Sequence, residues 1–108
     1  MDRTRIAAVV AGELFATESA VETALAQAVG LMRRMIETRR ALGLSPATGD
    51  PAMRRVEAVV NALGDAQREI VRTHDALDAV RRVAGLPAQA FGPLVKPEGR
   101  LEEDEPAG

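Results

Sequence analysis

The sequence predicts an all-α fold: an antiparallel hairpin of two long helices that assembles as a four-helix bundle or a ring and ends in a disordered C-terminal tail. Three observations lead to this prediction. Apolar residues between Met53 and Ala84 recur at alternating steps of three and four, which is typical of a helix packed lengthwise on other helices. A Gly-Leu pair followed by proline occurs twice, as a helix stop signal. Prolines and glycines interrupt the sequence after residue 87.

The composition restricts the possible functions. The 108 residues suit one domain, and with two Phe and no Trp or Tyr the core must be built from aliphatic side chains. Such a hairpin buries little surface by itself, which favours self-association. Without Cys and with a single His, the chain lacks thiolate and multi-histidine metal sites, so we expect no metal. It has no nucleophile-elbow, phosphate-loop or metalloprotease signature and few polar groups on its apolar faces, so we expect no cofactor and no enzymatic activity. The net charge of −2 gives no general attraction to nucleic acid or anionic membranes.

We expect a cytoplasmic protein with no membrane span. No apolar run approaches the roughly 18 residues that suggest a transmembrane helix. Arg3 and Arg5 precede a short apolar run, which weakly resembles a signal peptide, but Glu13 interrupts the pattern. The N-terminal stretch is therefore interpreted as the start of a helix.

The first helix is predicted from about residue 3 to 42, with Asp2 as its N-cap. Its apolar face is expected to consist of Ile6, Val10, Leu14, Val21, Leu25, Val29, Met32, Ile36 and Leu42. Gly43 suits the left-handed position after the helix, and Pro46 prevents the helix from continuing.

The second helix is predicted from residue 51 to 84, after a turn over residues 43–50. Asp50 is placed as its N-cap and Pro51 as its first residue. Both predicted helices end in a similar way, with RRALGLSP and RRVAGLP. We interpret the likeness as one stop signal used twice rather than as a duplication, because the helix interiors do not align. Residues 1–87 are predicted to form the hairpin and residues 88–108 a flexible acidic tail.

The apolar seam of the second helix is the predicted oligomer seam. It comprises Val56, Val60, Leu63, Gln67, Ile70, His74 and Leu77. The preceding positions Val59, Ala66, Thr73 and Val80 widen the stripe, enough to contact two neighbouring helices. The imidazole of His74 either fixes the register of the seam or acts as a pH switch.

Arginines gather around the predicted turn and form a candidate basic tip. They are Arg33, Arg34, Arg39, Arg40, Arg54 and Arg55, against the acidic residues Glu37 and Asp50. The tip is a candidate site for a polyanion or an acidic partner. It lacks aromatic residues for stacking on bases, and the chain has no helix-turn-helix pattern.

Three apolar residues of the tail, Phe91, Leu94 and Val95, form a candidate docking motif for another protein. The alternative is that they fold back onto the hairpin's own groove. The acidic end of the chain is also a candidate shield for the basic tip.

The favoured function is that of a non-enzymatic, homo-oligomeric adaptor or regulatory protein that acts by protein–protein interaction. In architecture the predicted hairpin is similar to the oligomerisation hairpin of phage small terminase subunits, and this resemblance implies DNA packaging, with the basic tip contacting DNA. A third possibility is an amphipathic coat of the phasin type on a granule or lipid surface.

Overall fold

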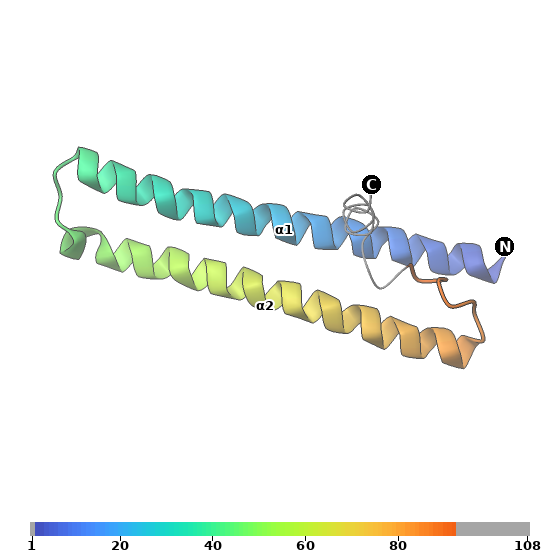
Figure 1. Ribbon diagram of the computed structural model, residues 1–108. Coiled ribbons are helices and arrows are strands. Elements are labelled where there is room, and N and C mark those ends of the chain that lie inside the picture. The colour runs from blue at the N-terminus through green and yellow to red at the C-terminus, as the bar shows by residue number, and fades with distance from the viewer. Residues whose placement is uncertain (1, 93–108) are drawn as a thin grey trace, which may run out of the picture. The chain divides into compact units, whose positions relative to one another are not determined.

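The computed structural model is all-α and describes residues 2–92. Helix α1 spans Arg3–Ala41 and helix α2 spans Pro46–Ala84, each 39 residues long. Residues 42–45 form the turn between them, so the two helices make the predicted hairpin (Figure 1). Within the described residues, every regular element is a helix.

The hairpin divides into two compact units. The terminal unit comprises Met1–Thr17 and Ile70–Gly108, of which residues 2–17 and 70–92 are described. The turn unit comprises Glu18–Glu69 and contains the turn between the helices. Each helix therefore contributes one section to each unit.

Helix α1 ends in a Schellman motif. The amide of Leu44 donates to the carbonyl of Arg39 (3.0 Å), and the amide of Gly43 donates to the carbonyl of Arg40 (3.1 Å). Gly43 has a φ of 69°, in the left-handed region that glycine enters without steric cost. The Arg39 guanidinium also donates, through Nη1, to the carbonyl of Leu44 (3.1 Å).

Helix α2 ends in the same motif, contact for contact. The amide of Leu86 donates to the carbonyl of Arg81 (3.0 Å), the amide of Gly85 donates to that of Arg82 (3.2 Å), and Gly85 has a φ of 68°. Nη1 of Arg81 donates to the carbonyl of Leu86 (3.2 Å). The repeated sequence at the two helix ends thus builds the same cap twice, as the stop-signal interpretation predicts.

The first residues of α1 are held at two points. Oδ1 of Asp2 accepts the amide of Thr4 (3.2 Å), which is the predicted N-cap interaction. Nη2 of Arg3 donates to the carbonyl of Ala84 (2.6 Å), the last residue of α2. A cation at that carbonyl complements the negative end of the α2 dipole.

Helix α2 begins at Pro46, which corrects the predicted start at Pro51 and shortens the predicted 43–50 turn. The amide of Thr48 donates to the carbonyl of Ser45 (3.1 Å), and the Ser45 hydroxyl lies 3.4 Å from the same amide. Ser45-Pro46 is thus the same kind of start signal as Asp50-Pro51, because proline fits the first helical position. The earlier signal starts the helix, and Pro51 lies within it.

The predicted seam of α2 lies on the packed face of the hairpin. All seven of its residues are buried or half-buried. Val56, Ile70 and His74 are the deepest, with exposed fractions of 5%, 8% and 8%. This burial arises within a single chain, so the seam is covered without a second copy.

The packed face of α1 differs from the predicted stripe. Ten of its buried and half-buried positions follow alternating steps of four and three: Ala7, Ala11, Leu14, Glu18, Val21, Leu25, Ala28, Met32, Met35 and Arg39. Phe15 and Ala24, beside this line, are half-buried as well. Five residues of the predicted stripe are instead exposed, namely Ile6, Val10, Val29, Ile36 and Leu42. Alanines occupy three of these ten positions, and the exposed Ile6, Val10 and Val29 lie next to them in the sequence.

Residues 88–91, predicted as the start of the flexible tail, form turns in the terminal unit. The amide of Ala90 donates to the carbonyl of Pro87 (3.0 Å), and Ala90 is buried. Gly92 lies against the Phe15 ring, where a Cβ atom would come within 3.1 Å of the ring carbons. This agrees with the interpretation that the segment folds back onto the hairpin.

Candidate functional site

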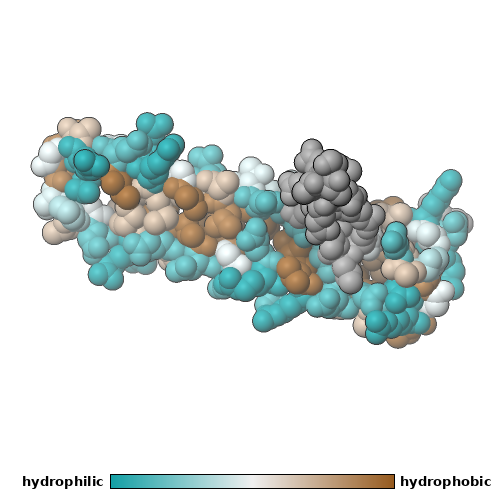
Figure 2. All heavy atoms as spheres, viewed as in Figure 1, coloured by the Kyte–Doolittle hydropathy of each residue, from teal (hydrophilic) through white to brown (hydrophobic). Residues whose placement is uncertain are grey.

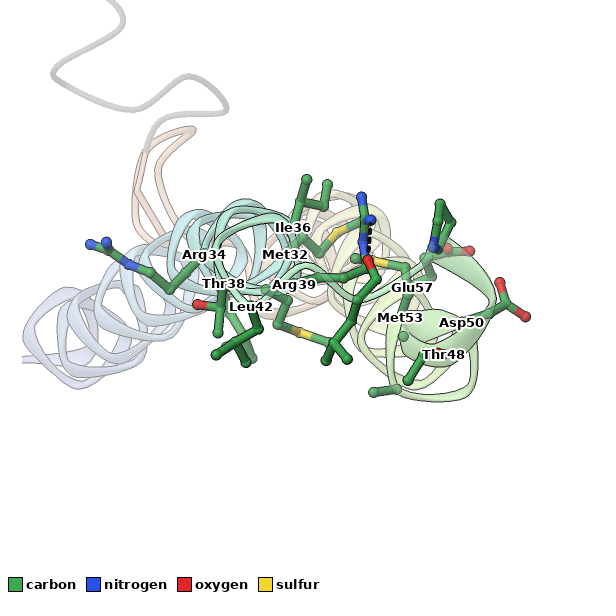
Figure 3. Close-up of a pocket in the computed structure, with 16 residues that line it drawn as sticks. Met32, Arg34, Ile36, Thr38, Arg39, Leu42, Thr48, Asp50, Met53 and Glu57 are labelled. Carbon is green, nitrogen blue, oxygen red and sulfur yellow. Dashed lines mark hydrogen bonds between the residues drawn. The ribbon is translucent and has the colours of Figure 1, made fainter.

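A groove of about 770 Å³ opens in the turn unit, beside the turn (Figure 3). Its lining comes from α1 between Leu31 and Arg39, from Leu42 and Leu44 of the turn, and from α2 between Pro46 and Glu57. Three of the chain's four methionines line it, at positions 32, 35 and 53. Methionine side chains adapt to differently shaped apolar ligands, so this groove is the leading candidate binding site.

The groove combines an apolar interior with polar groups. Figure 3 shows Ile36 at one rim and Thr38 and Leu42 at the other, with Arg39 between them. Arg39 is held by its bond to the carbonyl of Leu44, so its guanidinium has a fixed position. The sequence analysis named Arg39 but missed the groove; the signal it could have used is the spacing of three between Met32 and Met35 immediately before the turn.

All six arginines of the predicted basic tip lie in the turn unit. Two of them interact with the chain itself: Arg39 caps α1, and Nε of Arg54 lies 2.7 Å from Oδ2 of Asp50. The hydrogen bond to Asp50, with its negative charge, raises the pKa of Arg54. The other four, Arg33, Arg34, Arg40 and Arg55, are exposed. Of the six, Arg34 and Arg39 border the groove.

A smaller hollow of about 250 Å³ lies in the terminal unit and includes His74, Asp78 and Phe91 in its lining. His74 is buried, and its ring centroid lies 6.2 Å from that of Phe15, with the planes tilted by 51°. Oδ1 of Asp78 lies 2.8 Å from Nε of Arg81. The hydrogen bond from Arg81 is the main cause that lowers the pKa of Asp78.

Only one residue of the predicted docking motif is described. Phe91 is half-buried in the terminal unit, where it lines the small hollow with His74. Leu94 and Val95 lie outside the described residues. The placement of Phe91 matches the alternative in which this segment packs on its own hairpin.

The residues that flank the seam differ in charge between its two sides. After Arg3 at the start of α1, one side carries only uncharged residues in both helices. We call it the uncharged side: Val10, Thr17, Ala24, Leu31 and Thr38 in α1, and Ala52, Val59, Ala66, Thr73 and Val80 in α2. The other side includes three acidic residues among uncharged ones, and we call it the acidic side: Phe15, Glu22, Val29 and Ile36 in α1, and Glu57, Gly64, Val71 and Asp78 in α2. In an antiparallel helix pair, equivalent flanking positions of the two helices fall on the same side of the seam.

Within residues 2–92, neither helix is apolar enough over a sufficient length to cross a membrane. The same residues contain no cluster of three or more side chains suited to hold a metal ion. Comparison with protein-family models, with curated proteins and with solved structures found no match.

Proposed function

We propose that the chain is a non-enzymatic helical interaction module, in which two or more hairpins associate along their uncharged sides and the assembly binds other proteins. The observation that carries this proposal is the imbalance between buried and exposed apolar residues. In the described part of the chain, three large aliphatic side chains are buried, Leu14, Val56 and Ile70, and none is completely inaccessible. Twelve large apolar side chains are exposed by 40% or more. A second copy would remove part of this surface from water.

The exposed apolar residues are distributed in a way that suits a helix bundle. Figure 2 shows apolar residues reaching the surface of the turn unit between bands of polar ones. Val59 and Val80 are half exposed on the uncharged side of α2, three heptads apart. A charge in the centre of a helical interface must be desolvated, so a side without charges is the better surface for a second hairpin.

The arginines favour a protein partner over DNA. Arg39 and Arg54 are engaged by groups of the chain itself, a carbonyl and a carboxylate. DNA binding depends on several cations that are available to phosphates. An apolar groove next to a moderate positive charge is better suited to an acidic, partly apolar protein segment.

The mass of the full-length chain in solution tests the proposal, and sedimentation equilibrium measures it directly. We expect a multiple of the 11.5 kDa chain mass. The double variant Val59→Glu, Val80→Glu places two charges on the uncharged side. Because each charge would have to be desolvated, the dissociation constant should rise by about a hundred-fold or more.

The matched control is Val71→Glu, Val83→Glu, which makes the same two substitutions in the same helix. Val71 lies on the acidic side and is 60% exposed, and Val83 points outward and is 92% exposed. This control should associate like the parent chain. A parent chain that stays monomeric, or a control that dissociates as readily as the test variant, would refute association along the uncharged side.

A further inference from the structure

We propose that the groove of the turn unit binds the acidic C-terminal segment of this chain, residues 93–108. The proposal goes beyond self-association, and the segment can come from the same copy or from another. Leu31, Thr38 and Ala52 line the groove and also belong to the uncharged side, so the segment and a second hairpin would share these three residues. The proposal assigns a ligand class to the groove: an extended, acidic peptide with a few aliphatic anchors.

The first argument is charge complementarity. Residues 33–57, which include most of the groove, contain six arginines against Glu37, Asp50 and Glu57, a net charge of +3. Residues 93–108 contain five acidic residues against Lys96 and Arg100, a net charge of −3. The two charges match, whereas two turn units facing each other would repel. This excess of charge favours the tail over a second turn unit as the occupant.

The second argument is the match between anchors and groove. The segment carries Leu94, Val95 and Leu101, and its sequence from 94 to 101 spans about 23 Å when extended. The α1 part of the lining, from Leu31 to Arg39, is about 12 Å long. The spacing from Leu94 to Leu101 is therefore sufficient to cover this part of the lining. Pro93 and Pro97 disfavour a helix, and a proline-restricted extended peptide loses less entropy when it binds.

The third argument is the length of chain that follows the described residues. Gly92 is the last of them and lies against the ring of Phe15 in the terminal unit. The sixteen residues after it span up to about 50 Å when extended, so a long acidic stretch of chain is available as a ligand.

The test uses the full chain and its own methionines. The chain has no cysteine, so Ala107→Cys gives a single site for a nitroxide label near the end of the segment. Methyl-labelled methionine then reports on four positions, of which Met32, Met35 and Met53 line the groove. The fourth, Met1, precedes α1 in the sequence and serves as the reference signal. We expect the nitroxide to broaden the three groove methyl signals several-fold more than that of Met1.

Two variants separate binding from chance proximity. Neutralising the acidic run (Glu102→Gln, Glu103→Gln, Asp104→Asn, Glu105→Gln) should weaken the broadening about tenfold, since the attraction between opposite charges is lost. Ile36→Glu should do the same, because it removes an apolar rim residue and adds a repelling charge. The matched control is Val29→Glu, one heptad earlier on the same side and outside the groove lining, and it should leave the broadening unchanged.

Equal broadening of all four methyl signals would overturn the proposal. So would broadening of the groove methyl signals that is the same in the parent chain, in the neutralised variant and in Ile36→Glu. Groove methyl signals that shift with protein concentration in the neutralised variant would also overturn it, by assigning the groove to a second copy. Mixing nitroxide-labelled chains with methyl-labelled chains shows whether the segment comes from the same copy or another, and either origin supports the assignment. The sedimentation experiment on Val59 and Val80 is independent, so the two proposals can fail separately.

Discussion

The two units of the hairpin are built from the same pair of helices but differ in how well they cover their seam. The terminal unit contains six of the eight buried residues, namely Ala7, Ala11, Leu14, Ile70, His74 and Ala90. The turn unit contains the other two, Ala28 and Val56. The difference follows from the segment after α2, which packs Ala90 and Gly92 against the terminal unit.

This comparison shows what two helices can and cannot do alone. A helix pair covers one line of side chains, and the flanks of that line remain accessible unless a third element packs on them. In the terminal unit the third element is part of the described chain. In the turn unit no third element is described, and the methionine-lined groove is the candidate binding site there.

The largest effect should come from shortening matched leucines in the two units. Leu14 is buried in the terminal unit, and Leu25 is half-buried on the seam of the turn unit. Leu14→Ala should lower the free energy of unfolding by about 3 kcal/mol and Leu25→Ala by about half as much, because a half-buried side chain leaves a smaller cavity. Urea unfolding followed by circular dichroism measures both, and equal losses would remove the contrast between the units.

Substituting the capping glycines should affect the two units alike. Gly43 and Gly85 have nearly the same φ, 69° and 68°, and an alanine at either site is strained. We expect Gly43→Ala and Gly85→Ala each to cost about 1 kcal/mol. If one substitution lowers the free energy of unfolding several times more than the other, the two caps contribute unequally to stability despite their similar geometry.

Helical glycines should allow both units to be stabilised. A Cβ atom at Gly12, in the terminal unit, or at Gly30, in the turn unit, would have no neighbour within 4 Å. Each change to alanine should therefore raise the free energy of unfolding by about 0.5–1 kcal/mol, since alanine favours the helix. Thermal unfolding of the two single variants and the double variant checks this. A decrease at Gly12 would indicate a close contact made only in an assembly.

The smallest effect should be electrostatic and confined to the terminal unit. Since the pKa of Asp78 is lowered in the folded chain, its carboxylate stabilises the fold above the ordinary carboxyl pKa, and this contribution is lost as the pH falls through the folded value. Asp78→Asn should therefore be less stable than the parent near pH 7 and equally stable near pH 2. The control is Asp65→Asn, which removes the exposed partner of Arg68 in the turn unit and should matter less. A constant stability difference across this pH range would contradict the assignment.

The seam of α2 could be predicted from the sequence because its residues follow steps of three and four without interruption. Five of the seven are apolar, and Gln67 and His74 are the exceptions. The seam of α1 could not be predicted, because Ile6 and Ala7, or Val10 and Ala11, are adjacent apolar residues and the larger ones suggest burial. The regular spacing of four and three residues that begins at Ala7 identifies the packed face of α1 better than side-chain size does, although this spacing includes the charged residues Glu18 and Arg39.

The helix ends were predicted well because their determinants are local. A glycine, the leucine after it and the arginines before it are enough to specify the cap. The groove depends instead on the space that remains among side chains of α1, the turn and α2, and no local pattern specifies that space. The start of α2 was misplaced because Ser45-Pro46 and Asp50-Pro51 are equivalent local signals, and the local sequence does not decide between them.

The two caps have a consequence for how such a chain can change in evolution. Each cap is made from residues that adjoin the end of its own helix, so neither depends on how many turns come before it. Insertion of seven residues into each helix would keep the packing in phase and lengthen each by about 10 Å. Each helix can therefore gain length in fixed increments while both caps stay as they are.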